Sequence, residues 1–213
     1  GRMSWYFIET ERFQEEQVKE ALLNSQFDAF VPKKEMYFKK GYLTMLTLRF
    51  LFPGTVLIHD PASPPQFAKK LNAWLDQKQP GSEGIHREAD AYFSLASDEK
   101  ETFEQLLNEK KILQFSTGII RNKELHVLKG PLQGHEKEIQ KIKRHQRLAT
   151  LPIKLCGQTI PLILGLEVIE KTDRNQIVVQ ALLISFAIID YKLIESLRWR
   201  SLPFYFYSKD VTN

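Results

Sequence analysis

The sequence predicts an α+β fold in which an N-terminal α/β sandwich is followed by a small β-barrel. Helix-like and strand-like segments alternate over about the first 110 residues, whereas residues 116–171 contain short apolar runs separated by Gly and Pro. The charge balance changes at the same place. Residues 1–111 carry 15 Lys and Arg against 17 Asp and Glu, and residues 121–171 carry 10 against 5. The expected segments are a first domain at 3–112, a second at 113–171 and an extension at 172–213 with no assigned role.

The first domain is expected to begin with a strand, a helix and a second strand. Residues 5–10 form an aromatic and β-branched run, which predicts a buried strand. Residues 15–25 place apolar side chains three or four positions apart, which predicts an amphipathic helix. Residues 27–35 predict the second strand, and Pro32 is expected to end it.

The same alternation continues to the end of the first domain. Residues 41–60 contain two more apolar runs, separated by Pro53 and Gly54. Residues 66–77 and 98–111 predict amphipathic helices. Two stretches rich in Pro, Gly and Ser are expected to be flexible insertions, namely 60–65 and 79–84.

The second domain is predicted to consist of short strands that are separated by turn residues, a pattern typical of a small β-barrel. The runs expected to form these strands are 125–130, 151–157, 160–164 and 166–171. Residues 134–149 allow two interpretations. Ile139 and Ile142 are three apart, which suits a helix, but the surrounding pattern favours strands, and we expect strands.

The extension contains two apolar runs. Residues 177–189 are mostly apolar over 13 positions, whereas a membrane-spanning helix needs about 20. We expect a buried helix or strand pair rather than a membrane anchor, and we expect residues 201–209 to form an aromatic edge segment.

The composition indicates a soluble protein without catalytic chemistry. Hydrophobic residues make up 43% of the 213 positions and charged residues 26%. The single cysteine, Cys156, cannot form an intrachain disulfide, which fits a reducing compartment, and no export signal is evident, so we expect a cytoplasmic location. None of the five histidines stands at metal-ligand spacing, and no phosphate-binding loop or nucleophile motif occurs. We therefore expect no enzyme activity, no metal and no cofactor.

The positive charge of the second domain is concentrated beside a tight loop. Gly130 and Gly134 permit positive φ, and Pro131 stiffens the loop between them. The basic residues around this loop are Lys129, His135, Lys137, Lys141, Lys143, Arg144, His145 and Arg147. Lys and Arg neutralise phosphates, so this segment predicts a polyanionic partner; the alternative is a solvated polar surface.

Three stretches together resemble the NusG family of transcription elongation factors. They are WYFIET before the helix EEQVKEALL, FVPKKE followed by LRFLFPGTVLI, and KGPLQGHEKEIQKI. The resemblance covers about residues 4–171. It implies a NusG-type N-terminal α/β domain and a C-terminal KOW domain, a five-stranded SH3-like barrel. Within the family, GPLQGHEKEI, KIKRHQR and LGLEVIEK are most similar to the LoaP branch, which acts in processive antitermination.

The resemblance also implies a polymerase-binding surface in the first domain. Family members bind the clamp helices of RNA polymerase through an aromatic patch. The positions that match it here are Tyr6, Phe52, Pro53 and Gly54, and Thr55 stands where the family usually has Tyr. Aromatic anchors are typical of binding hot spots, although Tyr6 and Phe52 would also suit a protein core.

For the second domain the resemblance implies that the basic residues bind a hairpin in the nascent leader RNA. A second basic cluster, Lys33, Lys34, Lys39 and Lys40, extends this track to the RNA or to DNA of the transcription bubble, or else it only aids solubility. We expect a monomer that has no membrane partner. Two alternatives stay open: a general NusG-type factor whose KOW domain binds Rho or a ribosomal protein, and a structural RNA-binding protein of ribosomal type.

Overall fold

The computed structural model describes residues 3–87 and 92–169, and the predicted extension at 172–213, with its runs at 177–189 and 201–209, lies outside them. The described chain divides into two units. One contains residues 3–37 and 47–169 with the gap at 88–91, and the other is the short segment 38–46.

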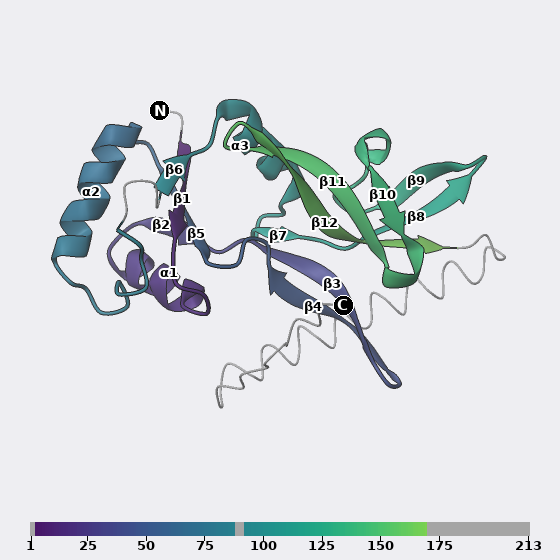
Figure 1. Ribbon diagram of the computed structural model, residues 1–213, viewed down its shortest axis with the longest axis horizontal. Helices are drawn as coiled ribbons and strands as arrows, with labels where there is room; N and C mark the ends of the chain where they lie inside the picture. Colours follow the sequence, from purple (N-terminus) through teal and green to yellow (C-terminus); the bar gives the residue numbers. More distant parts are fainter. Residues whose placement is uncertain (1–2, 88–91, 170–213) are drawn as a thin grey trace. The chain divides into compact units, whose positions relative to one another are not determined.

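A four-stranded antiparallel sheet in the order β2-β5-β1-β6 forms the centre of the N-terminal region (Figure 1). Its strands are β1 (Ser4–Glu9), β2 (Asp28–Phe30), β5 (Thr55–Asp60) and β6 (Tyr92–Ser94). The helices are α1 (Glu15–Asn24), α2 (Pro64–Asp76) and α3 (Ser97–Leu106). The predicted strands at 5–10 and 27–35, the helices at 15–25 and 66–77, and the strand after Pro53-Gly54 are thereby confirmed in kind, with shifts at their ends.

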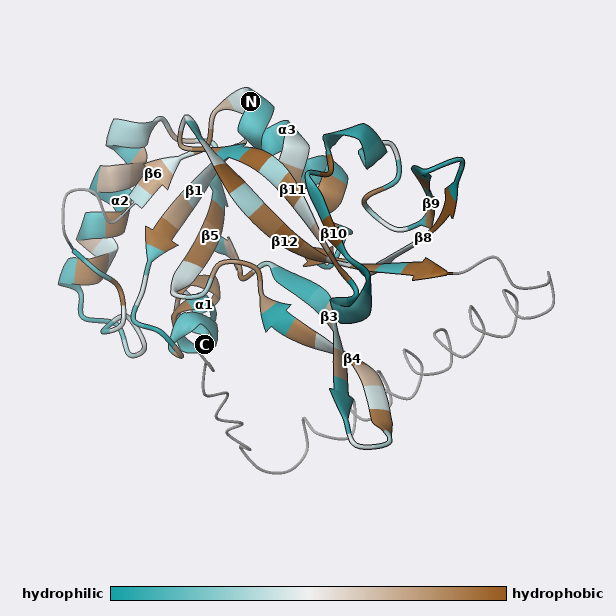
Figure 2. Cartoon of the chain, turned by 45° about the vertical axis from the view of Figure 1, so that its right-hand side comes forward, coloured by the Kyte–Doolittle hydropathy of each residue, from teal (hydrophilic) through white to brown (hydrophobic). Residues whose placement is uncertain are grey.

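Side chains of β1 alternate between two hydrophobic clusters, because successive residues of a strand point to opposite faces. Tyr6 and Ile8 pack in a cluster with the buried faces of α1 and α2. Trp5 and Phe7 pack in the other cluster, which also contains Phe103 of α3 and residues of the second domain. Figure 2 shows the corresponding hydrophobic colouring of β1 and β5. Both faces of the sheet are therefore covered.

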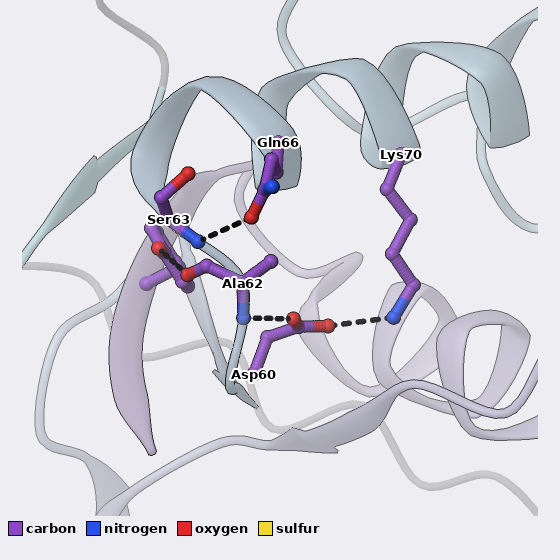
Figure 3. A network of polar contacts seen from close by, with 6 residues as sticks. Asp60, Ala62, Ser63, Gln66 and Lys70 are labelled. Carbon is purple, nitrogen blue, oxygen red and sulfur yellow. Dashed lines mark hydrogen bonds and ion pairs between the residues drawn. The ribbon is translucent and has the colours of Figure 1, made fainter. Parts of the chain in front are cut away.

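The segment 60–65 was predicted to be a flexible insertion, but it is an ordered cap for α2 (Figure 3). Asp60 accepts a hydrogen bond from the Ala62 amide at 2.9 Å, and its carboxylate forms an ion pair with Lys70 at 2.6 Å. The Ser63 amide donates to Gln66 Oε1 at 3.2 Å, which satisfies one of the free amides at the start of the helix. The prediction was wrong because Pro-rich sequence also suits a first helical turn.

The predicted helix at 98–111 ends earlier, at Leu106. Leu107 has extended backbone angles, and the side chain of Asn108 accepts hydrogen bonds from the amides of Lys110 and Ile112. This side chain closes a turn after the helix, and the chain then enters the short strand β7 (Ile112–Leu113).

The second domain contains a five-stranded sheet in the order β10-β11-β12-β8-β9. Its strands are β8 (Ser116–Arg121), β9 (Glu124–Lys129), β10 (Lys141–Lys143), β11 (Leu148–Leu155) and β12 (Gln158–Ile169). Strands β12 and β8 are parallel and the other pairs are antiparallel. Within the described residues β9 and β10 remain edge strands, so the sheet is open and the predicted closed barrel is not confirmed.

Strand β12 is continuous, although two strands were predicted at 160–164 and 166–171. Gly165 lies inside it and pairs with Leu148. A Cβ at this glycine would collide with the ring of Phe115, so Gly165 serves close packing rather than a turn.

Residues 134–149 contain no α-helix. They form η1 (Glu136–Glu138), β10 and η2 (Arg144–Gln146), which confirms the expectation of strand over helix in this segment. Ile139 and Ile142 both pack against the hydrophobic cluster. Two residues three positions apart thus reach the same cluster without a helix, because a 3-10 turn precedes Ile139 and a strand contains Ile142.

A third sheet has the order β4-β3-β7 and contains β3 (Lys33–Lys40) and β4 (Leu43–Phe50). Lys33 pairs in parallel with Ile112, and Lys34 with Leu113. Phe115 follows β7, is buried, and donates its amide hydrogen to Glu35 Oε2 at 2.8 Å. The pairing of β7 with β3 and the contact of Phe115 with Glu35 therefore fix the connection from β7 to β8.

Candidate functional site

The loop between β9 and η1 fixes the start of the basic segment. Gly130 and Gly134 have φ values of 105° and 88°, as expected from the sequence. A Cβ at Gly130 would lie 2.6 Å from the Cα of Ser116, so only glycine fits there. Leu132 is fully buried, and its amide donates to Ser116 Oγ at 3.2 Å. The loop is anchored on both sides of Pro131.

Strand β10 then places two cations on one face. Ile142 packs inward opposite Ala149, so its neighbours Lys141 and Lys143 point outward, about 7 Å apart along the strand. Both are exposed, and neither has an ion pair with another described residue. Figure 2 shows the turns beside β10 in the hydrophilic colour.

The other predicted RNA-binding residues divide into two groups. Four are exposed, namely Lys129, Lys137, Arg144 and His145. Lys129 ends β9 and Lys137 lies in η1, whereas Arg144 and His145 lie in η2, directly after β10; β9 and β10 are opposite edges of the sheet. His135 and Arg147 are half-buried and have partners within the protein. His135 Nδ1 lies 3.1 Å from Glu138 Oε1.

Arg147 is held on three sides. Its Nε lies 3.2 Å from Glu167 Oε1, and its guanidinium carbon lies 3.6 Å from the centre of the Tyr37 ring. Its backbone has φ of 54°, and its carbonyl accepts a hydrogen bond from Leu166. A guanidinium that stacks on a ring and pairs with a carboxylate has an evident structural role.

The predicted polymerase-binding residues differ in their exposure. Tyr6 is buried, its ring stacks on Phe67 at a centroid distance of 3.8 Å, and its hydroxyl donates to the Ala62 carbonyl at 2.6 Å. Burial raises the pKa of this phenol. Tyr6 is thus a core residue in this structure, whereas Phe52 is half-buried and Pro53 is exposed.

Two residues that the sequence analysis did not single out hold the loop at 52–55. Gly54, with φ of 75°, donates its amide hydrogen to Glu15 Oε1 at 2.7 Å and accepts one from the Thr10 amide at 2.9 Å. Glu15 is fully buried although it is an acid. In the sequence Glu15 is an acidic residue in the first turn of a predicted helix. Acidic residues are common there because they stabilise the helix dipole, so this position did not indicate a buried contact. The ring of Phe52 lies 5.3 Å from Phe7 and 5.6 Å from Phe103.

The second basic cluster is split by the fold. Lys33 Nζ pairs with Glu16 Oε1 at 2.7 Å, and Lys34 Nζ donates to the Ile163 carbonyl at 2.9 Å. Burial lowers the pKa of Lys34, and the charge of Arg49 adds to this effect. Lys39 and Lys40 lie in the separate segment 38–46 and are exposed.

Over residues 3–87 and 92–169, no group of three or more His, Cys, Asp or Glu could hold a metal ion. In the same ranges no helix is long and apolar enough to cross a membrane. The ring of His59 contacts those of Trp5 and Phe30, at centroid distances of 4.8 and 4.5 Å, and its Nδ1 lies 3.0 Å from Asp28 Oδ2. It belongs to the core rather than to a reactive site.

The N-terminal region is similar to a known protein family. Residues 3–77 match the family model described as "NusG: Transcription termination factor nusG". The match runs from β1 to the end of α2 and includes the loop at 52–55. No curated protein matches the chain. The chain is thus similar to the NusG family over residues 3–77.

Proposed function

We propose that the protein is a transcription elongation factor of the LoaP-like, antiterminating kind, which docks on RNA polymerase with its N-terminal domain and binds structured nascent RNA with residues 129–147. The observation that carries the proposal is the match of residues 3–77 to the NusG family. No chemical step is needed, because both roles are binding roles.

The polymerase contact is assigned to the loop at 52–55, and the clamp helices are the assigned partner. Phe52 is half-buried and Pro53 exposed, so both have surface available to a partner. Glu15 and Thr10 hold the backbone of Gly54 in place, which lowers the entropy cost of binding. Tyr6 is assigned a supporting role, because its ring is in the core.

The RNA contact is assigned to the loop and 3-10 turn that follow β9, and to β10 with the turn η2 after it. The proposed contacts are Lys129, Lys137, Lys141, Lys143, Arg144 and His145. The resemblance of the loop at 129–142 to the second domain of the family supports a KOW-type module. Its exposed cations would bind phosphates, and amide and imidazole groups would contact unpaired bases in a hairpin.

Two contacts on one molecule would make each partner raise the effective concentration of the other. A factor recruited by a leader hairpin would therefore stay on the polymerase that made it. By favouring the closed, elongating clamp it would reduce pausing and increase readthrough of terminators.

A reconstituted transcription assay with the cognate RNA polymerase and the full chain tests the docking assignment. The variants Phe52→Ala and Pro53→Ala should lower polymerase affinity, Phe52→Ala by about 30-fold, as for a hot-spot residue. Thr55→Tyr, which restores the residue usual in the family, should raise it. Because a folding defect would not raise affinity, a gain with Thr55→Tyr excludes that explanation.

Equal polymerase binding by all four proteins would overturn the docking assignment. Failure to recover RNA polymerase at all would favour the ribosomal-type RNA-binding alternative. Sequencing of RNA crosslinked to the full chain supplies the hairpin for binding assays, and recovery of no structured RNA would overturn the RNA assignment.

A further inference from the structure

Glu136 is an acidic residue within the otherwise basic segment 129–147. Its side chain reaches back along the chain, and Oε1 accepts the amide hydrogen of Val127, nine residues earlier, at 3.2 Å. Val127 lies on the edge strand β9, and its buried side chain belongs to the large hydrophobic cluster. The carboxylate therefore ties the start of η1 to a fixed point of the sheet.

Backbone amides surround this carboxylate. Burial alone would raise the pKa of Glu136, but hydrogen bonds from the amides of Glu136 itself, Val127 and Gly134 outweigh burial. The charge of His126 acts in the same direction as these amides, so the pKa lies below its ordinary value of 4.5. A carboxylate that accepts amide hydrogens is favoured in its ionised form. At neutral pH Glu136 is thus a charged acceptor at the base of the loop.

The contact between Glu136 and Val127 closes a loop that carries two of the proposed RNA contacts. Leu132, near the middle of this loop, is fully buried, so the loop is anchored there as well as at its base. Lys129 comes two residues after Val127. Lys137 directly follows Glu136. Both lysines are exposed, and both are attached to backbone that this one hydrogen bond joins.

The other acid of the segment, Glu138, makes a different contact. It is exposed, and its Oε1 lies 3.1 Å from Nδ1 of His135. By charge alone each of the two acids opposes the binding of a phosphate backbone. Loss of the Glu136 side chain has a second effect of opposite sign, because the anchor of the loop is lost with the charge. The two acids can therefore be told apart by experiment.

We propose that Glu136 is a positioning residue for RNA binding, which holds the Val127 amide and so fixes the backbone from which Lys129 and Lys137 reach neighbouring phosphates. The inference rests on the proposed function, in which this segment binds structured RNA. Lysine has a long flexible side chain, so a fixed backbone beneath it reduces the entropy that is lost on binding. The repulsion from one carboxylate is smaller than this gain, because amide dipoles directed at the carboxylate oppose its field.

The test measures binding of the full chain to the leader hairpin recovered by crosslinking. Glu136→Ala should weaken binding about fivefold although it removes a negative charge, because two long side chains then have to be ordered on binding. Glu136→Gln keeps an oxygen acceptor for the amide and should bind at least as tightly as the unchanged protein. The matched control Glu138→Ala removes the same charge two residues away and should also bind at least as tightly.

A double-mutant cycle asks whether the effect passes through the two lysines. In a protein that carries Lys129→Ala and Lys137→Ala, the further change Glu136→Ala should not weaken binding, since the side chains that it positions are gone. A loss of affinity that is the same with and without the lysines overturns the positioning role.

Amide hydrogen exchange measures the loop without RNA. Glu136→Ala should accelerate exchange at Val127 about tenfold, and Glu136→Gln should leave it unchanged. Amides that pair β11 with β12 should exchange as before in both variants, which shows that the sheet is intact.

Unchanged exchange at Val127 in Glu136→Ala overturns the proposal, and so does RNA binding by this variant as tight as that of the unchanged protein. Both results leave the proposed function standing, because the unchanged protein still binds the hairpin. If the unchanged protein binds no structured RNA, the proposed function and this inference fail together. The two failures are thus separate results.

Discussion

Lys33 and Lys34 begin β3, the central strand of its sheet, whereas Lys141 and Lys143 lie on β10, an edge strand. In the sequence both are lysine pairs beside apolar residues, and both were candidate nucleic-acid contacts. In the fold Lys33 forms an ion pair with Glu16, and Lys34 donates a hydrogen bond to the carbonyl of Ile163. Lys141 and Lys143 are exposed.

The difference follows from strand position. The start of β3 lies against other elements of the fold, so Lys33 finds a carboxylate of α1 and Lys34 a carbonyl of β12. An edge strand has one neighbour, and charged residues there also discourage pairing with another chain. Lysines on edge strands therefore have two explanations, solubility and ligand binding, which only binding measurements separate.

The largest expected effect is on the edge strand. Lys141→Ala with Lys143→Ala should weaken binding to the leader hairpin about tenfold at moderate salt and lower the magnitude of the salt slope by about 1.5. The free energy of unfolding should stay within about 0.5 kcal/mol, because both residues are exposed. Gel shifts over a salt series and chemical denaturation measure the two quantities. An unchanged salt slope would make these lysines mere solubilising residues.

Arg147 should contribute to stability, as Lys33 and Lys34 do, although it adjoins the exposed basic residues of β10 and η2. Arg147→Ala should lower the free energy of unfolding by about 1–2 kcal/mol, because the ion pair with Glu167 and the stacking on Tyr37 are both lost. Arg147→Gly should lower it less, since φ of 54° costs a non-glycine residue about 1 kcal/mol. Denaturation curves of both variants decide this. A larger effect on RNA affinity than on stability would return Arg147 to the RNA surface.

A smaller effect is expected at Lys34. Its replacement by Ala should lower the free energy of unfolding by about 1 kcal/mol, since the Ile163 carbonyl loses its hydrogen bond. For a protein of this size that is a fall of about 2–4 °C in Tm. Affinity for RNA should not change. If the variant is fully stable but binds RNA weakly, the contrast between the two pairs fails.

The smallest effect concerns His59, whose charged form is disfavoured by burial. Burial lowers its pKa below the ordinary value of 6.5. The hydrogen bond that its ring donates to the Asp28 carboxylate opposes this, and the charges of Lys111 and Lys100 lower the pKa further. The unfolded chain therefore binds the proton more readily, so stability is full above about pH 6.5 and declines as the pH falls toward the folded pKa. Tm measured from pH 7.5 to 5 should show this decline, and His59→Gln should show a weaker one. Identical pH profiles for the two proteins would contradict it.

Much of the N-terminal region could be predicted from local pattern. The strand at β1 and the helix at α1 follow from spacing of apolar residues alone. Strands β6, β7 and β8 were not predicted, because two are only two or three residues long and their register depends on distant partners.

The candidate sites were less predictable than the fold. Tyr6 and Pro53 belong to one motif in the sequence, but one is in the core and the other is exposed, since neighbouring strands and α2 cover Tyr6. Glu15 could not be identified from the sequence, because its partner is the amide of Gly54, far along the chain. Sequence pattern thus proposes which residue types are present, and tertiary contacts decide which remain available.

The connection through β7 and Phe115 bears on how the protein can be taken apart. The expected boundary at 112/113 falls within β7, and the ring of Phe115 fills the space left by Gly165. A chain cut there would divide β7, so that Leu113 would lose its pairing with Lys34 and the Phe115 amide would lose its acceptor, Glu35. Biochemists who separate the halves would do better to keep residues 112–115 on both fragments.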